Sequence, residues 1–384
     1  MVVDKTTFDK YRQCSDPVFQ PLFQELITIN SFPTPANYAR IKLNGDRCPF
    51  LSEKLCSIQK HLGEDHLSHT CATFPRNIHD FLGTIERSLD LSCPEAARLA
   101  LTDPRPIRFQ LSETDMAPAS RDGVSAINAK TPGAASDSWE TRDLVISILQ
   151  NRRYPLSKRL IFVAQLCDLL TGISKAGEQE QTFGVLHEFR DRIESGRVEE
   201  ALDAQATDQP LQLGLFLELI NARIRIDFVP QRYLDLFQEF ASGIQLQGGC
   251  DWNQLIFRYA QACRQYYMPF MDQHEYLLEN YLVSYAFRTV FPFAWPSGSL
   301  AAECNPDPAE RYMVMASYYS ITKTVMIGVS GKYKSDFGID HVVRCIQSSS
   351  RLLEHCISYP AKILEVLASK GITTARQMAI VTGS

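Results

Sequence analysis

The chain has 384 residues, of which 45% are hydrophobic and 22% charged, and its formal net charge is −5. This composition is that of an ordinary soluble globular protein, and the length predicts two or three domains. A weakly acidic chain has no bulk attraction for nucleic acid or for anionic lipid, because both favour basic surfaces. We therefore expect neither nucleic acid nor a membrane as a partner.

The compartment is predicted from charge, hydropathy and cysteine usage. The first residues, MVVDKTTFDKYRQ, carry charges where a signal peptide would be apolar. The apolar stretch 281–296 contains Arg288 and Pro292 and is shorter than the ~20 residues of a membrane-spanning helix. We expect a cytoplasmic protein, in which the eleven cysteines stay reduced.

The first part of the chain, residues 1–111, holds five of the eleven cysteines among short polar turns. It predicts a small cysteine-rich domain that binds a metal or a cluster. Residues 112–138 are rich in Ser, Ala, Asp, Gly and Pro and have few large apolar residues. Such a segment cannot repay the entropy of ordering, so we interpret it as a flexible linker.

Residues 139–384 show apolar side chains at intervals of three and four, which is typical of amphipathic helices. Alternating strands with Asn-Gly or Asp-Gly hairpins are not recognisable, although LNGDR at 43–47 is a candidate turn. The predicted fold class is mainly α: a small cysteine-rich N-terminal domain followed by a large helical domain. The expected helices cover 140–151, 156–173, 211–224, 232–244, 254–267, 275–291, 309–330, 340–357 and 361–371.

Four cysteines stand in settings that suit metal ligands: Cys48, Cys56, Cys71 and Cys93, with seven, fourteen and twenty-one residues between them. These spacings exceed the two to four residues between the paired ligands of a zinc knuckle, so only a folded scaffold can bring the thiols together. Prolines follow the first and last of the four, and nearby basic residues would offset the charge of a thiolate-bound cluster. We predict that these four cysteines bind a metal, either iron or zinc.

Other residues of these types are given simpler interpretations. His61, His66 and His69 could ligate zinc, but their sequence context favours a solvated surface. The cysteines after the linker are interpreted as small buried hydrophobic residues: Cys167, Cys250, Cys263, Cys304, Cys345 and Cys356.

Three stretches carry a resemblance to a known family: CPFLSEKLCSIQKHLGEDHLSHTCATFPR from residue 48, LDLSCPEAARLAL from residue 89 and ENYLVSYAFRTVFPF from residue 279. They resemble the bacterial flagellin lysine-N-methylase family, the FliB-type proteins. The resemblance implies transfer of methyl groups from S-adenosylmethionine to lysines of flagellin, and a [4Fe–4S] cluster on cysteines. By position, the family's central cysteine motif falls on Cys48, Cys56 and Cys71, and its Ser-Cys-Pro-Glu motif begins at Ser92 and includes Cys93.

The chain departs from this family at its start. Members resemble a wider group of metal-chelating proteins that open with a cysteine cluster ending in Cys-Cys, and this chain begins with a segment similar to the one that follows that cluster. An inactive truncated paralogue is therefore one alternative. A zinc- or iron-stapled helical binding module without catalytic turnover is another.

The chemistry leaves further alternatives open. Lysine methylation needs a neutral amine, so the site must desolvate the lysine or supply a base. Glu279, Tyr281 and Tyr285 share one expected helix and are candidates to line a cavity, although simple packing is the alternative that we favour. Three thiolates would leave an open iron for S-adenosylmethionine, whereas four would close the centre. A glycine-rich dinucleotide-binding turn is not recognisable, and neither radical nor polar methyl transfer is selected.

Overall fold

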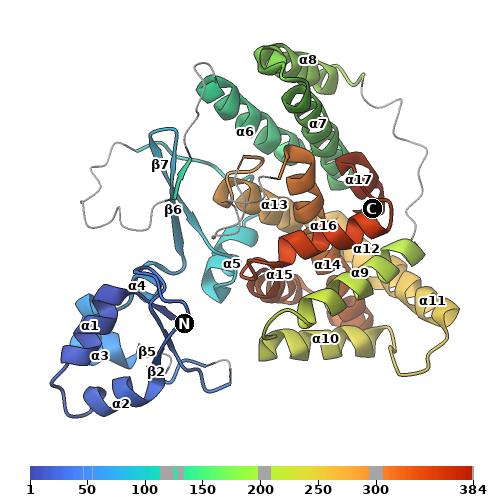
Figure 1. Ribbon diagram of the computed structural model, residues 1–384. Coiled ribbons are helices and arrows are strands. Elements are labelled where there is room, and N and C mark those ends of the chain that lie inside the picture. Colours follow the sequence, from blue (N-terminus) through green and yellow to red (C-terminus); the bar gives the residue numbers. More distant parts are fainter. Residues whose placement is uncertain are drawn as a thin grey trace. The chain divides into compact units, whose positions relative to one another are not determined.

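The computed structural model describes residues 1–45, 47–53, 55–112, 125–127, 134–197, 209–293 and 306–382 (Figure 1). By their contacts, the described residues divide into two compact units. The first unit comprises Met1–Ile78, and the second begins at His79.

The first unit is built from short elements. An antiparallel sheet of order β1-β3-β2 joins β1 (Val2–Val3), β3 (Ala39–Ile41) and β2 (Ile27–Ile29). Two helices, α1 (Lys5–Gln13) and α2 (Phe19–Leu26), contact each other beside it. A two-stranded ribbon of β4 (Leu51–Ser52) and β5 (Leu55–Cys56) leads into α3 (Ser57–Leu62) and then α4 (His69–Thr73).

The core of the first unit is small and largely aromatic. Tyr11 stacks on Phe23 with ring centroids 4.1 Å apart, and Phe23 lies 5.5 Å from Phe50. Three cysteines, Cys14, Cys48 and Cys56, are half-buried against this core. The thiols of the first unit are thus part of its packing and do not simply project into solvent.

The second unit opens with a β-hairpin, which the sequence did not predict. β6 (Arg76–Phe81) and β7 (Thr84–Leu89) are neighbours in a three-stranded sheet whose third strand, β8 (Ser125–Ile127), runs parallel to β6. The turn between β6 and β7 is Leu82-Gly83, and both residues have positive φ, 53° and 87°. Such a pair is the backbone of a tight hairpin turn, but leucine is an unusual first residue there, so the turn has no strong sequence signal.

Apart from β8, the described regular structure in the rest of the second unit is helical. The first helix is α5 (Pro94–Leu101), and further helices follow it in the chain. They are α6 (Ala134–Gln150), α7 (Leu156–Ala176), α8 (Thr182–Glu194), α9 (Gln209–Ile224), α10 (Gln231–Gly243), α11 (Trp252–Ala262), a π-helical turn (Cys263–Tyr267), α12 (Met268–His274), α13 (Tyr276–Arg288), α14 (Pro308–Tyr333), α15 (Ile339–Leu353), α16 (Tyr359–Ser369) and α17 (Ala375–Thr382).

Helix α14 is the centre of this unit. It contacts α7, α9, α10, α11, α15, α16 and α17, which lie around it in Figure 1, and nearly all of its side chains are buried. Its approach to α10 is close enough that a Cβ atom on Gly243 would clash with the carbonyl oxygen of Gly328. Glycine is therefore required at this crossing.

These observations confirm a mainly α fold, and they correct several boundaries. Helix α6 begins at Ala134, inside the expected linker, and α8 and α17 were not predicted. Most of the expected linker, residues 113–124 and 128–133, lies outside the described residues. The two units meet at residue 78, earlier than the expected boundary at residue 111, because the hairpin and α5 pack with the helices. That the N-terminal part of the chain is a metal-binding domain stays a prediction.

None of the described helices has both the length and the apolar character needed to cross a bilayer.

Candidate functional site

Three of the four predicted metal ligands, Cys48, Cys56 and Cys71, lie within electrostatic range of one another in the first unit. All three are half-buried. Burial raises the pKa of Cys48 and of Cys71, and the neighbouring thiols raise both pKa values further. A raised pKa makes the thiols of Cys48 and Cys71 poorer ligands until a metal cation displaces the proton.

Local structure explains where two of these thiols lie. Cys56 ends β5 and stands at the N-cap of α3, and Cys71 lies in the short helix α4. The hydroxyl oxygen of Ser68 accepts a hydrogen bond from the backbone N–H of Cys71 at 3.3 Å, which caps α4.

The donor types of this group fit a soft metal or an iron–sulfur cluster, but the arrangement is not that of a complete site. Within the part of the chain that the structure describes, no three His, Cys, Asp or Glu side chains are placed to hold a metal ion. Cys93 belongs to the second unit, where it is the N-cap residue of α5. Metal ligation by Cys48, Cys56, Cys71 and Cys93 stays a prediction.

The interpretation of the later cysteines as buried residues is confirmed for four of them. Cys167, Cys263, Cys345 and Cys356 are buried, and Cys250 is half-buried. Cys304 lies outside the described residues.

A second candidate site is a cavity of about 460 Å³ in the second unit. Its walls come from four places: the end of β7, the end of α5, the irregular segment Asp103–Phe109 that follows α5, and one face of α13. This volume is within the usual range of small-molecule sites.

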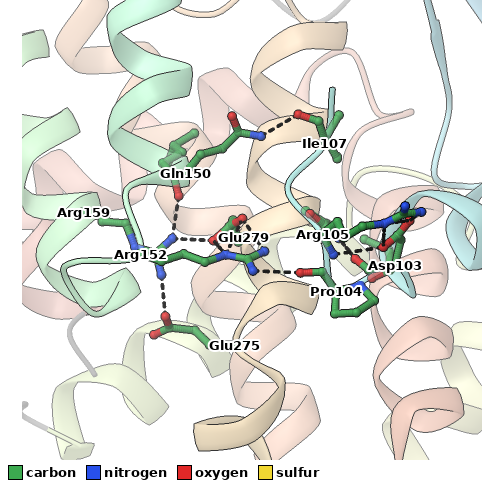
Figure 2. A network of polar contacts seen from close by, with 12 residues as sticks. Asp103, Pro104, Arg105, Ile107, Gln150, Arg152, Arg159, Glu275 and Glu279 are labelled. Atoms are coloured by element: carbon green, nitrogen blue, oxygen red, sulfur yellow. Dashed lines mark hydrogen bonds and ion pairs between the residues drawn. The ribbon is translucent and has the colours of Figure 1, made fainter. Parts of the chain in front are cut away.

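The segment Asp103–Phe109 is fastened to the helices by side chains that donate to its backbone. In Figure 2, Arg152 Nη1 donates to the Pro104 carbonyl oxygen at 2.8 Å, and Gln150 Nε2 donates to that of Ile107 at 2.8 Å. The amide of Asn280 donates to the carbonyl oxygens of Leu101 at 3.2 Å and Asp103 at 2.9 Å. This wall of the cavity is therefore held in place although it has no regular secondary structure.

A buried ion-pair network supports the same wall, as Figure 2 shows. Glu279 is 1% exposed and accepts hydrogen bonds from Arg152 at 2.9 Å and from Arg159 at 2.7 Å. Arg159 also pairs with Glu275 and donates to the carbonyl oxygen of Leu149. Because Glu279 has two guanidinium partners, it is committed to structure and is not a free base.

The aromatic part of the cavity is formed by Phe109 and Phe287, whose ring centroids lie 4.5 Å apart. Phe287 is backed by the guanidinium of Arg142, 5.4 Å from its ring centroid, and Arg142 is itself buried and paired with Glu86 at 2.7 Å. The contact with Arg142 thus fixes the position of the Phe287 ring.

The polar part of the cavity contains groups that lack partners. Among the described residues, Arg87 and Arg108 form no ion pair, whereas Arg105 pairs with Asp103 at 2.6 Å. The hydrogen bonds from Arg105 lower the pKa of Asp103 to about 2. Two buried polar atoms, Asn280 Oδ1 and Ser88 Oγ, have no hydrogen-bond partner in the structure. Buried polar groups are normally satisfied, so these atoms call for an explanation.

The sequence pointed to the correct helix, α13, but to residues on faces of that helix that do not line the cavity. Glu279, Tyr281 and Tyr285 are buried and do not line the cavity, so packing, the favoured alternative, is confirmed. The cavity is lined instead by Asn280, Ser284 and Phe287 of α13. The arginines of DPRPIRF at 103–109 were a signal that the sequence analysis did not use.

Comparison with known proteins decides the family. The model of the FliB lysine N-methylase C-terminal domain matches residues 142–381. The chain belongs to the FliB lysine N-methylase family. This confirms the resemblance seen in the sequence, and it assigns α13 to the family's C-terminal domain, whereas Arg87 and the segment Asp103–Phe109 precede the matched region.

Three curated relatives of this FliB-family chain share 37% identity with it over 107 residues, which is 27% of the chain. They are the flagellar biosynthetic protein FliU of Salmonella muenchen and the lysine-N-methylases of Salmonella typhimurium (strain LT2) and Salmonella choleraesuis. The match spans 63% of the length of the first and 26% of the length of each of the other two. No solved structure matches the chain.

Proposed function

We propose that this chain is a protein-lysine N-methyltransferase that methylates flagellin with S-adenosylmethionine. The observation that carries the proposal is the family match over residues 142–381. The printed names of the relatives support it, because two are lysine-N-methylases and one is a flagellar biosynthetic protein.

The reaction sets a requirement that the chain must meet. S-adenosylmethionine supplies an electrophilic methyl group on a sulfonium. A lysine ammonium has a pKa of about 10.4 and must lose a proton before its nitrogen can accept that group. Overall, one N–H bond is replaced by one N–CH₃ bond and one proton is released. The product keeps its charge but has fewer N–H donors, which would make a flagellin surface more adhesive.

We also propose that the cysteines hold a [4Fe–4S] cluster in a cytoplasmic protein. Support comes from the thiol donors Cys48, Cys56 and Cys71 in one environment, and from the free state of every described cysteine. The incomplete ligand arrangement means that no catalytic step is assigned to the cluster.

The methylation proposal is tested by mass spectrometry of flagellin from cells with and without the gene. We expect methylated lysines only when the gene is present. Identical lysine masses in the two strains, with the protein detected in the first, would contradict the proposal.

The cluster is tested by metal and sulfide analysis of anaerobically purified protein. We expect iron with sulfide, and a reduced iron content in Cys71→Ser but not in the control Cys250→Ser. Zinc without sulfide, together with unmethylated flagellin, would instead support the stapled binding module.

A further inference from the structure

We propose that the cavity between β7, α5, the segment Asp103–Phe109 and α13 binds the methyl donor, with the adenine on Phe109 and Phe287 and the carboxylate at Arg87 and Arg108. This inference rests on the proposed methyltransferase function, because that function requires a donor site somewhere in the chain. It adds the residues that form the site.

The charge of the cavity favours a carboxylate. Three arginines line it against one carboxylate, and Asp103 is already paired with Arg105. Arg87 and Arg108 therefore remain available in the described structure, and guanidinium groups form strong, often bidentate bonds with carboxylates.

The apolar part of the cavity suits a flat ring. Phe109 is 44% exposed, and its ring and that of Phe287 form a continuous aromatic surface with Ile107 beside it. Stacking of a nucleobase on an aromatic side chain is favourable and tolerates any base, because every base has a flat π-face. Because Arg142 fixes Phe287 from behind, little ordering entropy would be lost when a ring binds.

The unsatisfied polar atoms suit the remaining groups of the donor. Asn280 Oδ1 is an acceptor without a partner, and an adenine amino group is a donor that could satisfy it. Ser88 Oγ can donate or accept, as a ribose hydroxyl requires. A carboxylate that carries a flat ring and N–H donors is thus the ligand class that matches the cavity.

The positive charge of the cavity predicts different affinities for S-adenosylmethionine and for its demethylated product, S-adenosylhomocysteine. S-adenosylmethionine carries a sulfonium charge that S-adenosylhomocysteine lacks. Arginines near the ligand should therefore make the demethylated product bind more tightly than the donor.

The test is isothermal titration calorimetry of the full chain with S-adenosylhomocysteine, S-adenosylmethionine and AMP. We expect S-adenosylhomocysteine to bind most tightly, and Arg108→Ala and Phe109→Ala each to weaken its binding about 10-fold or more. Arg232→Ala, an exposed arginine on α10, is the matched control and should change binding less than about 2-fold. Both test positions are exposed, so circular dichroism should show unchanged folding in all three variants.

Three results would overturn the inference. The first is no binding of either sulfur ligand to the unchanged protein, and the second is tighter binding of AMP, which would indicate a phosphate site. The third is unchanged affinity in Arg108→Ala and Phe109→Ala. If that third result occurs in a protein that methylates flagellin, the donor site lies elsewhere and the proposed function stands. If flagellin is not methylated but the variants lose S-adenosylhomocysteine, the cavity assignment stands and the function is wrong.

Discussion

The two units of this chain differ in the kind of polar group that lies in or against their cores. In the second unit, buried charges are paired: Glu279 with two arginines, and Glu86 with Arg142. In the first unit, Cys14, Cys48 and Cys56 pack against the core, and burial raises the pKa of Cys48 and of Cys71, which favours the uncharged thiol.

The difference in core size explains this contrast. The second unit has one continuous hydrophobic core that runs from α5 to α17. The described part of the first unit, Met1–Ile78, has a small core, and units of that size often rely on a disulfide or a metal for extra stability. We therefore expect the second unit to depend on its ion pairs and its packing, and the first to depend on its caps and on whatever its thiols bind.

The strongest test of this comparison is to break the ion-pair network of the second unit. Glu279→Ala would remove one ion-pair partner of Arg159, whose side chain is 1% exposed, and would leave an unfilled cavity in its place. Removal of one member of a buried pair typically costs about 3–5 kcal/mol. Urea unfolding at neutral pH, followed by far-UV circular dichroism, measures this loss.

The matched control for this variant is Glu95→Ala. Glu95 also pairs with an arginine, Arg98, but both side chains are more than half exposed. We expect a much smaller loss, because exposed ion pairs contribute little to stability. Equal losses in the two variants would show that burial of the network is not what stabilises the second unit.

The sequence predicted most of the helical unit because its helices have an apolar face with a regular period. The pattern fails where that signal is weak. In the hairpin of β6 and β7 the turn residues are Leu82 and Gly83, and the strands hold more polar than apolar residues. Such a hairpin is fixed by its contacts with α13, which local sequence does not reveal.

The cavity could be predicted only in part, for a similar reason. One turn of α13 contains Glu279, Asn280 and Tyr281, all of them polar and buried, and periodicity cannot say which one faces a cavity. The deciding fact is that Asn280 meets the carbonyl oxygens of Leu101 and Asp103, far away in sequence. That four cysteines converge on one metal stays a prediction, because Cys48, Cys56 and Cys71 belong to the first unit and Cys93 to the second.

A smaller effect is expected from Lys323, a buried charge of the second unit near Cys263 and Glu275. Burial lowers the pKa of Lys323 from its ordinary 10.5 to about 8, although Cys263 and Glu275 oppose the shift. Between about pH 8 and pH 10.5 the unfolded chain binds more protons than the folded chain, so this residue makes stability rise with pH in that window. Lys323→Met should remove the penalty, gain on the order of 2–3 kcal/mol at pH 7 and flatten the rise.

Urea unfolding of both proteins at several pH values between 7 and 10.5 measures the difference. Tyrosines and cysteines also titrate in this range once the chain unfolds, so only the difference between the two proteins isolates Lys323. Lys362→Met, on the surface of α16, serves as the control and should follow the unchanged protein. A constant difference at all pH values would contradict a lowered pKa for Lys323.

The smallest effect is expected in the first unit, at the N-cap of α1. The carboxylate of Asp4 accepts hydrogen bonds from the Thr7 N–H at 2.8 Å, the Thr7 hydroxyl at 2.9 Å and the His69 N–H at 3.0 Å. It therefore caps α1 and also ties down the start of α4, the helix of Cys71. Asp4→Ala should cost about 1–2 kcal/mol, and hydrogen exchange should show faster exchange in Lys5–Gln13 and His69–Thr73 only.

The pH dependence of this last effect identifies its cause. Burial would raise the pKa of Asp4, but the hydrogen bonds from His69 and Thr7 outweigh burial and lower it. A carboxylate whose pKa is lowered by folding stabilises the protein above the unfolded value of about 3.9, and that contribution is lost as the pH falls through the folded value. The difference between the unchanged protein and Asp4→Ala should thus be full at pH 6 and shrink below about pH 4. Asp9→Ala, which removes only an exposed pair with Lys5, should cost less than about 0.5 kcal/mol. If Asp4→Ala instead speeds exchange throughout the second unit as well, the two units do not open separately and the comparison between them fails.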